Sequence, residues 1–123
     1  MTIQECYEKL GGNYSEVLGR LVSLKLVQKF ITKFLTDTSY GELCREMELG
    51  NRKEAFRAAH TLKGVCLNLG LGNLSVSAER LTDLLRPETD QIASEAFCEL
   101  ENVKLDYENT VEVIRTYLEC PTD

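Results

Sequence analysis

The first half of the chain repeats a signal that starts α-helices: a Thr, Asn or Ser followed three residues later by a Glu. The signal occurs at Thr2–Glu5, Asn13–Glu16, Ser39–Glu42 and Asn51–Glu54. In such a pair the first side chain accepts a hydrogen bond from a free N–H of the opening turn, and the glutamate accepts one from the cap residue. Apolar residues at helical spacing follow each signal, and no strand-like alternation competes with them. The chain is therefore predicted to be all-α.

The connections between the expected helices are short, which favours antiparallel neighbours. We expect an antiparallel up-and-down four-helix bundle over residues 38–119, with helices that start near Ser39, Asn51, Asn73 and Thr89. Residues 1–37 are expected to form additional short helices that pack over one end of the bundle. With 123 residues and no evident linker or repeat, the whole chain is expected to be a single domain.

The charge balance limits the classes of partner. The net charge is -6 at pH 7, which argues against general binding to nucleic acids or to anionic membranes. No apolar run approaches the roughly 18 residues of a membrane-spanning helix, and the first five residues lack the basic start of a signal peptide. We therefore expect a cytoplasmic protein.

The cysteines are five in number, widely scattered, and include no Cys-x-x-Cys pair. We expect reduced thiols, mostly buried, that behave as small hydrophobic residues. A zinc site is not expected, because His60 and Cys66 are predicted to lie on opposite faces of one helix. We expect neither a metal nor a cofactor in this chain. The five positions are Cys6, Cys44, Cys66, Cys98 and Cys120.

The only histidine, His60, lies in the middle of a helix predicted to span about residues 51–70. Apolar residues recur there every three or four positions and mark one buried stripe. At about 100° per residue, the centre of that stripe is almost opposite His60, so the imidazole is expected to point away from the core. The residues expected on the same outer side are Lys53, Phe56, Arg57, Lys63, Gly64, Leu67 and Leu71.

The segment Ala58–Gly70 resembles the signature of histidine-containing phosphotransfer (HPt) domains. It contains His-x-Leu-Lys-Gly from His60 to Gly64, two alanines directly before the histidine, and a glycine ten residues after it. The resemblance extends over nearly the whole chain and implies a free-standing HPt protein. The flanking positions that also match the layout of that family are Gly50, Asn51, Leu74, Ala78 and Leu81.

The resemblance implies that His60 accepts a phosphoryl group from a phospho-aspartate on a receiver domain and passes it to another receiver aspartate. The receiver would belong to a response regulator or to a hybrid sensor histidine kinase, and it would supply the carboxylates that hold Mg²⁺. The chain contains no phosphate-binding loop for ATP. We therefore expect a phosphocarrier without kinase activity of its own, and a monomer, as is common among HPt domains.

The residues around His60 suit such a transfer. A neutral imidazole nitrogen is a good nucleophile toward phosphorus, and the reaction needs mainly positioning and positive charge. Lys63 lies one turn after His60 and is expected to hold the phosphoryl oxygens, while Lys53 and Arg57 make the same side locally positive.

Gly64 costs the predicted helix on the order of 1 kcal/mol relative to alanine. Either a neighbouring helix packs closely against it, or it leaves room beside His60 for the active site of a partner. Its position on the His60 side favours the second interpretation, and in the HPt family this glycine is understood to permit close approach of the receiver. Phe56, Leu67 and Leu71 form either an apolar docking rim for that partner or ordinary packing at the edge of the bundle.

Two other functions remain open. The same chemistry would serve the phospho-accepting domain of a chemotaxis-type histidine kinase separated from its catalytic parts. A non-catalytic helical adaptor, in which His60 is incidental, would gain no acid-labile phosphate from a phosphorylated receiver. A metal-dependent hydrolase is not expected, because the chain has no second histidine and no convincing carboxylate cluster near His60.

Overall fold

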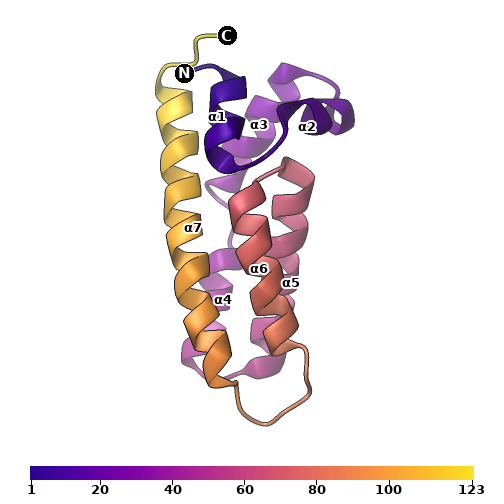
Figure 1. Cartoon of the computed structure of the whole chain (residues 1–123), viewed down its shortest axis with the longest axis vertical. Helices are drawn as coiled ribbons and strands as arrows, with labels where there is room; N and C mark the ends of the chain where they lie inside the picture. Colours follow the sequence, from indigo (N-terminus) through magenta and orange to yellow (C-terminus); the bar gives the residue numbers. More distant parts are fainter.

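The computed structural model describes all 123 residues, which form seven α-helices and no β-strand. The prediction of an all-α chain is confirmed. None of the helices is both long enough and apolar enough to cross a membrane. The helices are α1 (Ile3–Leu10), α2 (Tyr14–Leu21), α3 (Leu24–Phe34), α4 (Ser39–Glu48), α5 (Arg52–Leu69), α6 (Gly72–Leu85) and α7 (Ser94–Glu119) (Figure 1).

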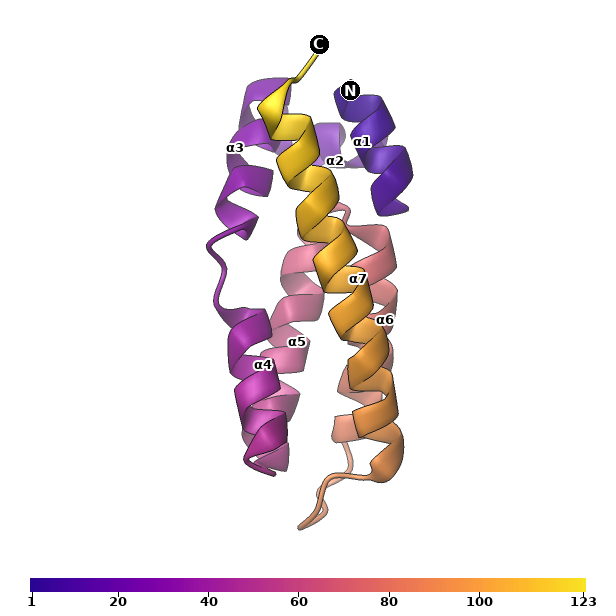
Figure 2. The ribbon, with the colours of Figure 1, turned by 90° about the vertical axis from the view of Figure 1, so that its left-hand side faces the viewer.

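Helices α4, α5, α6 and α7 form the predicted up-and-down bundle. α5 packs between α4 and α6, and α7 packs against α6 and also contacts α4. The chain reverses direction at each connection, and α1, α2 and α3 gather at the end of the bundle where α5 meets α6 (Figure 1). Seen from the side, α3 and α4 follow one another along the length of α7 (Figure 2).

A continuous hydrophobic core holds all seven helices together. Its 27 buried residues run from Ile3 to Tyr117, and every helix contributes at least one. Burial of Ile3 and of Leu10 in α1 contributes roughly 1.5–3 kcal/mol each to the free energy of unfolding. The buried Tyr7 hydroxyl donates a hydrogen bond to the carbonyl of Leu69 at 2.7 Å. The N-terminal helices are thus packed onto the bundle by apolar contacts.

Two of the four predicted helix caps form as expected. The Thr2 hydroxyl accepts a hydrogen bond from the Glu5 N–H at 3.1 Å, and the Glu5 carboxylate accepts one from the Thr2 N–H at 3.2 Å. The Asn13 side chain accepts a hydrogen bond from the Glu16 N–H at 3.3 Å. These contacts join residues three apart in the chain, and therefore the sequence alone reveals them.

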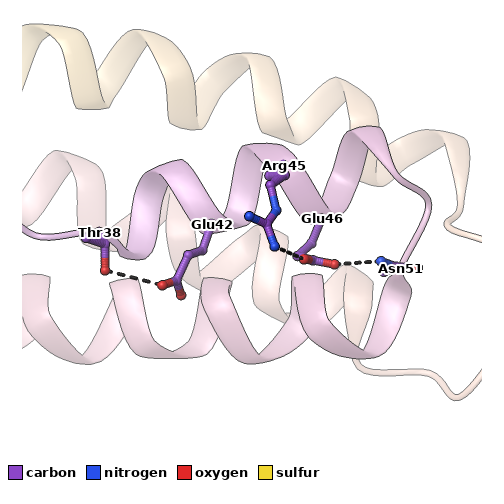
Figure 3. Close-up of polar contacts among 5 residues, drawn as sticks. All are labelled: Thr38, Glu42, Arg45, Glu46 and Asn51. Atoms are coloured by element: carbon purple, nitrogen blue, oxygen red, sulfur yellow. Dashed lines mark hydrogen bonds and ion pairs between the residues drawn. The ribbon is translucent and has the colours of Figure 1, made fainter.

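The other two predicted caps are wrong, and polar contacts along α4 show why (Figure 3). Ser39 is the first helical residue, and the hydroxyl of Thr38 before it donates to the Glu42 carboxylate at 3.3 Å. The Asn51 side-chain amide donates to the Glu46 carboxylate at 2.7 Å, so it ties the α4–α5 turn instead of capping α5. Arg45 lies 3.6 Å from the other carboxylate oxygen of Glu46.

The last helix begins at Ser94, five residues later than the predicted start near Thr89. The Thr89 N–H donates to the carbonyl of Pro87 at 2.9 Å, and its hydroxyl donates to the carbonyl of Gln91 at 2.7 Å. These local bonds make residues 87–93 a loop. Arg52 holds the start of that loop, because its guanidinium donates to the carbonyls of Leu85 at 2.7 Å and Thr89 at 3.1 Å.

Candidate functional site

His60 lies on the outer face of α5, eight residues after its start and nine before its end. The imidazole is exposed, as the apolar pattern predicts. It forms no hydrogen bond with another group of the protein. The opposite face of the helix is packed into the core through Ala55, Ala58, Ala59, Leu62, Cys66 and Leu69.

The C-terminal end of α5 is held by side chains from the N-terminal helices. Gly70 adopts the left-handed conformation (φ 70°) and ends the helix. The Arg20 guanidinium donates to the carbonyls of Leu67 at 3.0 Å and Asn68 at 3.2 Å. These bonds satisfy carbonyls that a helix end leaves free, and they place a positive charge at the negative end of the helix dipole.

Lys63 and Gly64 lie beside His60 in different surroundings. Lys63 is half-buried and pairs with no carboxylate of the protein, so its charge is free to bind an anion. A Cβ placed on Gly64 would meet nothing within 4 Å outside its own helix backbone. The interpretation that a neighbouring helix packs against Gly64 is therefore wrong, and the space above it is open.

An aromatic ring stands next to the imidazole on its other side. The ring centroids of Phe56 and His60 are 6.0 Å apart, with 39° between the ring planes. The guanidinium carbon of Arg86, from the end of α6, lies 5.3 Å from the Phe56 centroid. Sequence reasoning missed Arg86, because no pattern along the chain indicates this contact between two helices.

The other residues predicted on the outer side of α5 differ in their exposure to solvent. Lys53 and Arg57 are exposed, and Arg57 pairs with Glu54 at 3.0 Å. Leu67 is 52% exposed and Phe56 is half-buried. Neither the docking role of these four residues nor the role of Lys63 in transfer is tested by their positions alone, and both remain predictions.

Leu71 does not belong to this surface. Its side chain is fully buried in the core, with 0% exposure, which corrects its assignment to a docking rim. The prediction extended the helical spacing of α5 past its last residue, Leu69. Gly70 turns the chain, and the Leu71 N–H donates to the carbonyl of Cys66 at 2.9 Å. The side chain is therefore directed inward.

Cys66, the cysteine in the same helix as His60, offers no competing nucleophile because it is buried on the opposite face. Burial raises the pKa of the Cys66 thiol to about 12 and that of Cys6 to about 11, because desolvation disfavours the thiolate. Cys98 and Cys120 are exposed, so the expectation that most cysteines are buried is wrong.

The structure brings together no group of three or more His, Cys, Asp or Glu side chains in a geometry that suits a metal ion.

Comparison with known proteins adds one positive finding. The family model for the Hpt domain matches residues 25–117, which is more than half of the chain and extends from α3 through most of α7. Neither the search of curated proteins nor the search of solved structures returned a match. Residues 1–24, with α1, α2 and Arg20, lie outside the matched region.

Proposed function

This chain belongs to the Hpt domain family, and from that membership we propose that it is a phosphorelay intermediate in which His60 carries the phosphoryl group. Hpt domains are phosphocarrier modules that exchange phosphoryl groups with receiver domains. The proposed donor is a phospho-aspartate of one receiver, and the proposed acceptor is the aspartate of another. The receivers would belong to response regulators or hybrid sensor histidine kinases of two-component signal transduction.

The chemistry needs little from this chain beyond His60 itself. The lone pair of one imidazole nitrogen attacks phosphorus, and the bond between phosphorus and the aspartate oxygen breaks with its electron pair returning to the carboxylate. The phosphoryl group is then bonded to nitrogen, and the ring carries a positive charge until the proton on its other nitrogen is released. In the second transfer the lone pair of an aspartate oxygen attacks, and the phosphorus–nitrogen bond breaks back to the imidazole.

The observation that carries this proposal is the combination of exposed His60, unpaired Lys63 and the open space above Gly64 on one helix face. Lys63 would neutralise part of the charge on the phosphoryl oxygens. The open space would admit the active-site loops of a receiver. Lys53, Phe56, Arg57 and Leu67 would form the surrounding contact surface, with apolar and positively charged groups around a small reactive centre.

The remaining parts of the proposal concern the chain as a whole. We expect residues 1–123 to act as one Hpt domain, since one core includes both the matched region and the helices before it. The chain would work as a monomer in the cytoplasm and would transfer phosphate without binding ATP or nucleic acid.

Incubation with a purified receiver that carries labelled phospho-aspartate tests the proposal. The chain should gain acid-labile, alkali-stable phosphate, and His60→Gln should gain none. Because His60 is exposed, this variant should keep its helical circular dichroism and unfold within roughly 0.5 kcal/mol of the wild type. A wild-type chain that takes no phosphate from any receiver of its source would favour the adaptor, and label on His60→Gln would remove His60 from the mechanism.

A further inference from the structure

At the site, the Phe56 ring neighbours two other side chains, the guanidinium of Arg86 and the imidazole of His60. Arg86 follows the last residue of α6, and its guanidinium lies over the ring of Phe56 in α5 at 5.3 Å. The Phe56 ring in turn stands 6.0 Å from the imidazole of His60. Asp83 fixes the guanidinium from its own helix, with 3.2 Å between the charged atoms. A residue 26 positions after His60 is thereby connected to it through one aromatic ring.

We infer that Arg86 is a positioning residue for His60 and acts through Phe56. A guanidinium over an aromatic face is attracted by the ring electrons and stacks well because it is planar. This contact holds the Phe56 ring in place, and the ring then limits the orientations open to the imidazole. The inference rests on the proposed function, since it assigns Arg86 a part in presenting His60 to a phosphoryl donor.

The imidazole needs such a support because the protein offers it little else. His60 is exposed and forms no hydrogen bond with the chain, so neither ring nitrogen is fixed from behind. In the middle of a helix an exposed side chain is distributed over about two staggered χ1 positions, because the third clashes with the preceding turn. A neighbour that blocks the unproductive one raises the fraction of molecules ready to react by up to about twofold.

The contact contributes little to the fold itself. The Arg86 side chain is 57% exposed, and Asp83 would satisfy its charge without the ring. Exposed ion pairs of this kind stabilise proteins only weakly. Loss of Arg86 should therefore change the orientation of His60 and leave the free energy of unfolding nearly unchanged. This difference distinguishes a positioning role from a structural one.

The single histidine makes a direct test possible. His60 supplies the only imidazole resonances in a nuclear magnetic resonance spectrum of the chain, and these report the orientation and mobility of the ring. The variants are Arg86→Gln, Arg86→Lys, Phe56→Leu and the double variant Arg86→Gln/Phe56→Leu. Arg80→Gln is the matched control, because Arg80 is an exposed arginine of α6 that forms no ion pair and no hydrogen bond.

Phosphorylation is measured with phosphoramidate, a small donor that needs no docking surface. The imidazole nitrogen attacks phosphorus, the phosphorus–nitrogen bond of the donor breaks, and the protonated amine leaves as ammonia. Arg86→Gln and Phe56→Leu should each shift the His60 resonances, increase the mobility of the ring and slow phosphorylation by about twofold. Arg86→Lys should recover only part of the rate, because lysine keeps the positive charge but not the planar group that stacks on the ring, and Arg80→Gln should match the wild type.

The double variant decides whether Arg86 acts through Phe56. If it does, the double variant is no slower than Phe56→Leu, because the two changes remove the same effect. Three results would each overturn the inference. They are a double variant whose loss of rate is the product of the two single losses, an unchanged rate in Phe56→Leu, and unchanged His60 resonances in Arg86→Gln. A wild-type chain that no receiver phosphorylates would count against the proposed function, whereas the resonances would still decide whether Arg86 orients His60.

Discussion

The glycines in two regions of this molecule, the junction between the α1–α2 and α5–α6 turns and the middle of α5, have opposite surroundings. At the junction, a Cβ on Gly12 would overlap the carbonyl oxygen of Gly70, and a Cβ on Gly72 would overlap that of Gly11. Two turns thus meet there backbone to backbone. At Gly64, in the middle of α5, the same Cβ would enter open space.

The difference shows that glycine has two roles in this chain. At the junction, glycine lets the chain approach itself, so the benefit is realised when the protein folds. At Gly64 no other part of the chain uses the space, so the cost of a mid-helix glycine is not offset within the fold. We interpret this as room for another molecule beside His60, and four predictions test the contrast.

The largest effect is expected at the junction. Gly72→Ala should lower the free energy of unfolding by about 3 kcal/mol, the upper end of the range for overpacking, because the methyl group meets a carbonyl of the backbone. Urea denaturation measures it. Gly41→Ala is the control, since Gly41 lies in α4 and an added Cβ there would meet nothing within 4 Å. This variant should be more stable than the wild type. Equal effects at both positions would show that the junction is not closely packed.

A smaller loss is expected from Arg20→Gln, which removes the hydrogen bonds that tie α2 to the end of α5. The free energy of unfolding should fall by about 1 kcal/mol, since the bonds are exposed to solvent. Amide hydrogen exchange in the last turn of α5 should accelerate, whereas exchange near His60 should not. Lys25→Gln, a change at an exposed residue of α3, is the charge-matched control. No change in exchange would mean that Arg20 does not hold α5.

The sign of the effect should reverse at Gly64. Gly64→Ala should raise the free energy of unfolding by roughly 0.5–1 kcal/mol, because it restricts the unfolded chain and meets no neighbour in the folded one. Gly64→Gln should also fold, yet it should slow transfer from a receiver while phosphoramidate still reacts at nearly the normal rate. A destabilised Gly64→Ala would contradict the open space.

The smallest effect on stability is expected for Lys63→Ala. The free energy of unfolding should stay within roughly 0.5 kcal/mol of the wild type, because Lys63 forms no ion pair. Transfer from a receiver should slow, and the difference from the wild type should narrow as salt screens the charge. Rates that match the wild type at every salt concentration would exclude Lys63 from the mechanism.

Sequence reasoning succeeded where the determining contacts are local. The caps at Thr2 and Asn13 and the stop at Gly70 involve neighbours within a few residues, and the exposure of His60 follows from helical spacing alone. Those features were enough to predict the all-α bundle and the face on which the histidine lies.

It failed where the geometry of a turn or a contact between two helices decides. The Asn51 side chain binds Glu46 across a turn and leaves α5 uncapped, and a change of chain direction at Gly70 moves Leu71 from the expected rim into the core. No local pattern in the sequence indicates the contacts that Arg20 and Arg86 make with α5. The Leu67 carbonyl lies 47 positions from Arg20, and the Phe56 ring lies on a different helix from Arg86. Such contacts follow only from the packed arrangement of helices.

The position of His60 in the middle of α5 also affects how firmly a bound phosphate would be held. Helix N-termini bind phosphate tightly, since their first N–H groups are free and the dipole is positive there. His60 is two turns from that end, where each N–H is already bonded within the helix. A phosphoryl group on its imidazole would receive no hydrogen bond from the backbone. The phosphorus–nitrogen bond would therefore keep a high transfer potential. We therefore expect transfer from His60 to an aspartate of a receiver to be thermodynamically accessible, because the folded chain does not stabilise the phosphorylated state.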